Sequence, residues 1–163
     1  MPPIRAKKHR LPDAAYRGER NVAFTVNVEG RRPLFDDSSV VEAMLPILAE
    51  QTARFGCLVG IYCFMPDHLH LVLCGQSERA DAKAAMDGFK HKSGLWLHGH
   101  RPDFAWQGDY YDHIIRRSDD WRRQVFYVYM NPVRRGLVDD PAAWPHTGAI
   151  GFDLTESLID AHY

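Results

Sequence analysis

The chain has 163 residues, of which 45% are hydrophobic and 25% are charged. This is the composition of an ordinary folded domain, and it excludes a disordered or fibrous protein. The net charge of −1 gives no sign of a strong general binder of nucleic acid. No apolar run is long enough to span a membrane, and the basic N-terminal residues lack the apolar segment of a secretory signal. Three cysteines without CxxC spacing favour buried thiols in a cytoplasmic protein: Cys57, Cys63 and Cys74.

Basic and acidic residues alternate along the chain in four segments. Residues 1–35 hold 8 lysines and arginines against 3 acidic residues, and residues 91–138 hold 8 against 5. The other two segments, 36–90 and 139–163, are net acidic. If the two basic segments meet in the fold, they form a positive face without a positive total charge. Solvated surface charges that happen to cluster would give the same pattern, so charge alone does not decide between the two interpretations.

The first predicted elements are a strand and a helix. Residues 21–28 alternate apolar and polar side chains, as a half-buried strand does. Residues 36–39 then open a helix, with Ser39 and Glu42 at the spacing of a capping box. Apolar side chains recur along this helix every three or four residues, which predicts one buried stripe, and Pro46 predicts a kink in it.

The second group of elements completes an α+β pattern. We expect strands at 58–65, 69–73 and 109–115, a helix at 80–96, and a last helix that Ser118 caps and Asn131-Pro132 ends. This order predicts an antiparallel sheet with helices packed mainly on one face. The acidic residues 139–163 follow in a Pro- and Gly-rich stretch, so we expect a loosely packed tail there.

A His-Leu-His triplet is the most informative motif. On a strand, residues two apart point to the same face, so His68 and His70 project together while Leu69 and Leu71 fill the other side. Two imidazoles at this separation can bind one divalent metal, and the apolar reverse face would hold them rigidly. Two partly exposed histidines that are hydrogen-bonded to their neighbours would show the same triplet. The motif alone therefore leaves both interpretations open.

The last predicted helix adds further polar groups. Tyr127 and Asn131 are four residues apart and share one helical face, with Arg123 one turn earlier. A phenol and a carboxamide oxygen that point the same way can supply a nucleophile and a third metal ligand. An amphipathic helix with a surface tyrosine would have the same pattern. Together with the histidines, however, the helix favours a catalytic site.

Several segments together resemble the signature of a known family. Residues 62–71 resemble the HUH motif (His-hydrophobic-His) of single-tyrosine transposases, and residues 127–138 look like the downstream signature of the REP-associated tyrosine transposases. The resemblance implies the ferredoxin-like, RRM-like HUH fold for residues 16–138, between a basic extension at 1–15 and the acidic tail. Further matching segments are Ala23–Val26, Arg31–Phe35, Phe89–Gly94, Trp106-Gln107, Tyr111–His113 and Trp144-Pro145.

The resemblance also implies a reaction and its residues. In that family two histidines and a polar residue one helical turn past the tyrosine bind Mg²⁺ or Mn²⁺, which here implies His68, His70 and Asn131, with Tyr127 as nucleophile. The implied reaction is metal-dependent cleavage and strand transfer of single-stranded DNA at hairpin-associated sites, through a 5′-phosphotyrosine intermediate. The cations expected to contact the DNA are Arg31, Arg32, Lys90, Lys92 and Arg123.

Two other functions would use the same residues. A catalytically silent regulator would bind hairpin DNA without cleaving it, although it would not need all four catalytic groups. A metal-dependent hydrolase would activate water with the histidine pair, and it would tolerate Tyr127→Phe. The expected partner is single-stranded or hairpin DNA, with no membrane, for a monomer or homodimer in the cytoplasm or at the nucleoid.

Overall fold

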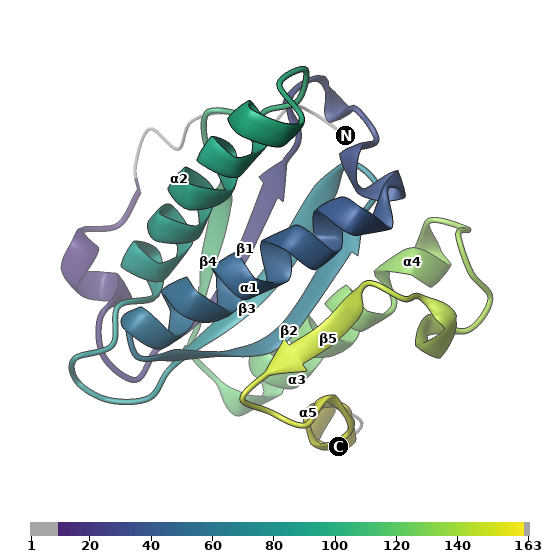
Figure 1. Cartoon of the computed structure of the whole chain (residues 1–163). Coiled ribbons are helices and arrows are strands. Elements are labelled where there is room, and N and C mark those ends of the chain that lie inside the picture. Colours follow the sequence, from purple (N-terminus) through teal and green to yellow (C-terminus); the bar gives the residue numbers. More distant parts are fainter. Residues whose placement is uncertain (1–9, 162–163) are drawn as a thin grey trace.

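A computed structural model describes residues 10–161 of the chain, with side chains described through residue 158. Five strands form one antiparallel sheet in the order β4-β1-β3-β2-β5, and Figure 1 shows helices on both of its faces. The strands are β1 (Asn21–Asn27), β2 (Cys57–Met65), β3 (His68–Gly75), β4 (Tyr111–Ile115) and β5 (Thr147–Ile150). The helices are α1 (Ser38–Arg54), α2 (Ala82–His100), α3 (Ser118–Tyr129), α4 (Asn131–Arg134) and α5 (Leu154–Ala161), with short 3₁₀ turns at Asp13–Tyr16, Glu29–Arg31, Leu34–Asp36 and Pro141–Ala143.

The two faces of the sheet carry separate apolar clusters. The two long helices α1 and α2 lie side by side on one face (Figure 1), over a large core that includes Phe24, Leu71 and Phe89. The opposite face carries the shorter α3 and α5. Its smaller cluster, called the α3-side cluster below, includes Val72 and Val125. The α+β fold with an antiparallel sheet is confirmed. The longest helices share one face as predicted, while α3 and α5 cover part of the other.

Three helices start differently from the predictions. Asp37, not Ser39, caps α1, because the Asp37 carboxylate accepts a hydrogen bond of 3.0 Å from the Ser39 amide. Asp81 caps α2 by accepting from the Ala84 amide, so this helix begins two residues later than predicted and runs on to His100. Ser118 is the first residue of α3 and not its cap, and no side chain caps that helix.

The prediction of a loosely packed acidic tail is wrong. Residues 147–150 form the edge strand β5, which pairs antiparallel with β2. The Trp144 indole donates a 3.1 Å hydrogen bond to the Phe64 carbonyl, and Leu154 and Leu158 of α5 pack against the α3-side cluster. The sequence did not predict this packing, because a four-residue strand and two leucines one helical turn apart give only a weak hydrophobic periodicity in a Pro- and Gly-rich segment.

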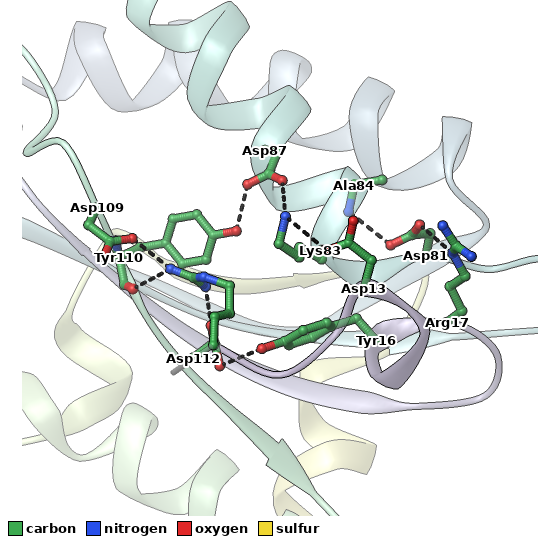
Figure 2. Close-up of polar contacts among 11 residues, drawn as sticks. Asp13, Tyr16, Arg17, Asp81, Lys83, Ala84, Asp87, Asp109, Tyr110 and Asp112 are labelled. Atoms are coloured by element: carbon green, nitrogen blue, oxygen red, sulfur yellow. Dashed lines mark hydrogen bonds and ion pairs between the residues drawn. The ribbon is translucent and has the colours of Figure 1, made fainter. Parts of the chain in front are cut away.

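The N-terminal segment is bonded to the edge of the sheet. Residues 1–9 of the predicted basic extension lie outside the described residues. Arg10 attaches the N-terminal segment to the sheet. Its guanidinium forms ion pairs with Asp112 on β4 and with Asp109, and it lies 4.2 Å from the Tyr110 ring centroid. Figure 2 shows the continuation of these contacts, in which the buried Tyr16 hydroxyl donates to Asp112. Part of the basic charge of residues 1–35 is therefore neutralised within the fold.

Among the described helices, none combines the length and apolar character that crossing a bilayer requires.

Candidate active site

Two imidazoles converge at the start of β3. His68 and His70 point to the α3 side of the sheet, while Leu69 and Leu71 are buried in the core beneath α1 and α2, as the alternation predicts. The two Nε2 atoms lie 3.1 Å apart. Two nitrogen ligands at about 2.1 Å from one metal ion, separated by a bond angle of 90–110°, lie roughly 3.0–3.4 Å apart. The spacing of the two nitrogens therefore fits joint coordination of a single cation.

Hydrogen bonds on the far side of each ring fix which nitrogen faces the site. The His68 Nδ1 lies 2.7 Å from the Asp67 carboxylate, and the His70 Nδ1 lies 2.9 Å from the Thr25 hydroxyl oxygen. When both Nδ1–H groups donate to these oxygens, both Nε2 lone pairs face each other and are available to a metal. Asp67 is in turn held by a 2.9 Å ion pair with Arg31.

The electrostatic environment keeps both rings neutral. Burial is the main cause that lowers the pKa of His70 to about 3, and the charge that His68 carries when protonated and the positive charges of Arg134 and Arg135 lower it further. Burial also lowers the pKa of His68, although the neighbouring Asp67 carboxylate opposes that shift. Neutral imidazole is the form that binds metal, so the rings need not lose a proton before they coordinate at neutral pH.

Asn131 completes the cluster because α3 ends just before it. Met130 joins α3 to the single-turn helix α4, and Pro132 occupies the first turn of α4, where its missing N–H costs nothing. Asn131 is 3% exposed, and its Nδ2 lies 3.4 Å from the His68 Nε2. Asn131 Oδ1 accepts a 3.4 Å hydrogen bond from Arg134. Rotating the amide by half a turn gives up that bond and directs Oδ1 toward the two imidazole nitrogens. Two imidazoles and one amide oxygen form a donor set suited to Mg²⁺ or Mn²⁺.

Tyr127 lies beside the histidines and is accessible. Its side chain is 52% exposed, and its ring centroid lies 6.4 Å from that of His70. The Arg134 guanidinium lies 3.8 Å from the Tyr127 ring centroid, and Arg134 also donates to the Tyr127 carbonyl oxygen. A cation at this distance holds the ring in place. An accessible phenol therefore lies beside a largely buried group of nitrogen and amide donors.

Positive charge surrounds the site. A pocket of about 200 Å³ beside His68 is lined by Arg31, Arg135 and Asp67, among others. Arg31 has a φ of 55°, which is uncommon for a residue other than glycine, and this backbone conformation accompanies its ion pair with Asp67. Such a setting favours an anionic group, such as a phosphodiester, next to the histidines.

The remaining predicted DNA-contacting cations lie away from the histidines or have other partners. Arg32 donates to the Asp103 carbonyl oxygen and stacks on Phe104. Arg123 is exposed and lies 4.0 Å from Asp120, so the guanidinium on the Tyr127 ring belongs to Arg134 and not to Arg123. The two predicted lysines are on α2, beyond the opposite face of the sheet: Lys90 lies 5.7 Å from the Tyr110 ring, and Lys92 forms a 3.0 Å ion pair with Glu50.

Three supporting residues were not assigned a role from the sequence. Arg134 is seven residues after Tyr127, which is two helical turns, so helical periodicity could have placed it on the same face. Thr25 was predicted to be on the polar face of its strand, but its contact with His70 depends on the pairing of β1 with β3. Asp67 was assigned no role, and no sequence spacing indicates its contact with His68.

Asn27 is an unusual neighbour of this site. Residues 25 and 27 of β1 share a face, and the β1–β3 register places Asn27 opposite His68 just as it places Thr25 opposite His70. The Asn27 side chain is fully buried, and both of its amide atoms lack a hydrogen-bond partner among the described residues. An unsatisfied buried amide lowers stability, so its presence next to His68 marks a position where the fold is not optimised for stability.

Comparison with known proteins assigns the family. The model of the family described as "Transposase IS200 like" matches residues 19–124, which include both histidines and end three residues before Tyr127. A REP-associated tyrosine transposase of Escherichia coli K12 is 26% identical over 126 residues, covering 75% of this chain and 72% of that protein. A solved structure of a REP-associated tyrosine transposase bound to a REP hairpin superimposes with a TM-score of 0.71 at 21% identity, covering 88% of this chain and 82% of that one. The resemblance seen in the sequence is confirmed, and the chain belongs to the IS200-like transposase family.

Proposed function

We propose that this transposase-family protein is a metal-dependent endonuclease and strand transferase that acts on single-stranded DNA next to a hairpin, with Tyr127 as nucleophile. The observation that carries the proposal is the convergence of the His68 and His70 Nε2 atoms, 3.1 Å apart, beside the exposed Tyr127 ring. A binding module has no need to combine neutral, oriented imidazoles with an accessible phenol.

The donor set fits a divalent cation. His68, His70 and Asn131 would hold it, with Asp67 and Thr25 orienting the two rings through their Nδ1 atoms. Mg²⁺ or Mn²⁺ in this position would polarise the phosphate and offset the charge that develops on its oxygens. Across the described residues, no three His, Cys, Asp or Glu side chains gather into a metal site, so the amide of Asn131 is needed as the third protein ligand.

The chain's own groups account for the transfer step. Arg134 places a positive charge on the ring of the nucleophile, where it would offset negative charge on the attacking oxygen in the transition state. The phenol releases its proton to solvent, and its oxygen attacks phosphorus. One bond forms between Tyr127 and phosphorus while the bond from phosphorus to O3′ breaks, and O3′ takes up a proton. The 5′-phosphotyrosine retains a phosphodiester's energy, so attack by another 3′-OH transfers the strand without ATP.

The proposed partner is hairpin DNA. The solved relative is described as bound to a REP hairpin, and this chain shares its fold over most of its length. The cations around the histidines, including Arg31, Arg134 and Arg135, provide positive charge for the scissile phosphate and its neighbours.

The experiment uses labelled single-stranded hairpin oligonucleotides from the host genome, incubated with Mn²⁺ or Mg²⁺ and separated on denaturing gels. Wild-type protein is expected to form a protein-linked DNA band that Tyr127→Phe does not form. Tyr129→Phe is the matched control, because Tyr129 is on the same helix but packs against the α3-side cluster.

Each outcome separates the candidate functions. A covalent band lost only in Tyr127→Phe supports the tyrosine nucleophile. Cleavage that survives in Tyr127→Phe contradicts the proposal and indicates a hydrolase in which the histidine pair activates water. Hairpin binding without cleavage across the whole genomic panel indicates a regulator.

A further inference from the structure

A second candidate site lies at the other end of α3. A cavity of about 590 Å³ opens where β1 begins, where β4 ends and where α3 starts. Cys74 and Ile115 belong to its floor, and Phe152 and Ser157 line the side formed by the C-terminal segment. The histidines lie at the opposite end of β3, so this cavity is separate from the site described above.

Three arginines line the cavity. Arg20 precedes β1, while Arg116 and Arg117 follow β4, so the antiparallel pairing of these two strands brings the three together. All three are exposed, and within residues 10–161 the structure gives none of them an ion pair or a side-chain hydrogen bond. Other arginines of the fold, such as Arg10 and Arg17, form ion pairs with carboxylates. Unpaired guanidinium groups in a concave surface are suited to phosphate oxygens.

The first turn of α3 adds donors at the same place. The first N–H groups of an α-helix have no intrahelical partner. Arg117, the N-cap of α3, makes no side-chain capping bond to them. The acidic residues of that turn do not line the cavity, because Asp119 and Asp120 point toward Arg122 and Arg123. A helix of 12 residues that begins in this way favours an anion at its N-terminus.

Two aromatic rings form one wall of the cavity. Trp121 and Phe152 lie with their ring centroids 6.2 Å apart, and Phe152 is 36% exposed. Trp121 is anchored by Gly60 of β2, where an added Cβ would come within 2.2 Å of the indole Cη2. Aromatic faces next to a cationic groove are the combination with which proteins bind single-stranded nucleic acid without reading its sequence.

From these features we infer that the cavity binds a nucleotide of the single-stranded DNA, with its phosphate on Arg20, Arg116 and Arg117 and its base or sugar against Phe152. The inference rests on the proposed function, because it takes single-stranded DNA as the substrate. Ser118 and Tyr127 are nine residues apart on α3, which corresponds to about 14 Å along the helix axis. At about 3.4 Å per stacked nucleotide, the strand would place up to roughly four nucleotides between this cavity and the reacting phosphate.

Two carboxylates in the cavity limit which kind of anion it can bind. Glu19 and Glu156 line it as well, so the cavity is not uniformly positive and a free polyanion would meet some repulsion. A nucleotide combines a phosphate with a base, and carboxylates can accept hydrogen bonds from N–H groups of bases, such as the N3–H of thymine. This mixture favours a nucleotide over an isolated inorganic anion.

The test measures binding without chemistry. Fluorescein-labelled dT20 is titrated by fluorescence anisotropy with EDTA present, in a Tyr127→Phe background, so that neither metal nor cleavage contributes. The double variant Arg116→Ala/Arg117→Ala is expected to bind about 10-fold more weakly at about 0.1 M salt, with the slope of log K against log salt shallower by about 0.7, because the two arginines hold one phosphate and about 0.7 is lost for each phosphate contact on a single strand. Arg20→Ala is expected to weaken binding about 3-fold.

A charge-matched control removes two arginines elsewhere. Arg54→Ala/Arg101→Ala loses the same formal charge from α1 and from the end of α2, on the opposite face, and should change the affinity less than 2-fold. Thermal melting confirms that each variant is folded. Equal loss in the control and the cavity variant, unchanged affinity in the cavity variants, or no dT20 binding by the parent overturns the inference. The covalent-band experiment is independent of this result, so failure of the chemistry and failure of the cavity are distinguishable.

Discussion

Strand β3 presents opposite chemistry to the two faces of the sheet. Toward α1 and α2 it contributes Leu69, Leu71 and Leu73, which are at most 1% exposed and belong to the large core. Toward α3 it contributes His68 and His70, whose ring nitrogens are oriented by hydrogen bonds and whose Nε2 atoms face each other. Adjacent residues of one strand therefore differ in role: the leucines pack the core, and the histidines present oriented ring nitrogens.

The difference shows how the fold separates stability from chemistry. The α1/α2 face gains free energy from burial of apolar surface, which tolerates no polar side chain without a partner. The α3 face holds buried polar groups, among them His68, Asn131 and the unsatisfied Asn27. Substitutions on the two faces should therefore affect different measurements, and adjacent residues of β3 provide the sharpest test.

The largest expected effect is on the polar face. His70→Ala removes one of the two converging nitrogens, so we expect product formation to fall by more than about 100-fold. The free energy of unfolding should change much less than in a core variant, because the His70 side chain belongs to neither apolar cluster. Gel assays and urea unfolding of the same preparation measure both quantities. A large loss of stability with activity in proportion to the folded fraction would contradict a catalytic role for His70.

The next effect is on the apolar face, one residue along the strand. Leu71→Ala leaves a cavity in the core beneath α1 and α2, and we expect it to lower the free energy of unfolding by about 2–5 kcal/mol. The folded fraction should retain its cleavage activity, since the histidines remain on their strand. Urea unfolding followed by tryptophan fluorescence measures the loss. A Leu71→Ala protein that is fully stable but inactive would contradict the assignment of stability to one face and chemistry to the other.

A third prediction concerns the cation on the nucleophile. Arg134→Ala removes the guanidinium from the Tyr127 ring, and we expect the rate of covalent-band formation to fall by about 10- to 100-fold. Arg134→Lys keeps the charge but not the stacked plane, so its rate should lie between the two. Arg123→Ala is the matched control on the same helix, and its rate should stay close to wild type, because Arg123 is exposed and lies near Asp120. Equal rates in Arg134→Ala and wild type would contradict this role.

Local periodicity in the sequence predicts some of the site residues, whereas contacts that depend on strand pairing are not visible in it. The alternation of β3 and the Tyr127–Asn131 spacing are local patterns, so strand and helix periodicity placed these residues on the correct faces. Thr25 and Asp67 could not be assigned in the same way, because their bonds to the histidines depend on strand register and on a turn. The cluster of Arg20 with the arginines after β4 was also hidden, since it forms only when β1 and β4 pair.

A fourth prediction concerns the unsatisfied amide. Asn27→Leu replaces a buried amide that has no partner with an apolar side chain that also branches at Cγ. We expect the free energy of unfolding to increase by about 1–3 kcal/mol, because the penalty for burying the amide is removed. Asn27→Ala, which leaves a small cavity, should gain less. Urea unfolding measures both variants, and a loss of stability in both would show that the Asn27 amide has a partner in solution.

The smallest expected effect compares the starts of α1 and α3. Asp37 caps α1, whereas α3 has no side-chain cap. Hydrogen bonds from Arg101 and then from Ser39 lower the pKa of the Asp37 carboxyl to about 2, below its value of about 3.9 in an unfolded chain. The charged carboxylate therefore favours the folded state above about pH 4, and this contribution is lost as the pH falls through about 2. Because Asp37 is exposed, salt should weaken the effect.

The difference in melting temperature between wild type and Asp37→Asn should stay constant from pH 7 to pH 5 and shrink between about pH 4 and pH 2. A difference that persists at pH 2 would assign the stabilisation to the shape of the cap and not to its charge.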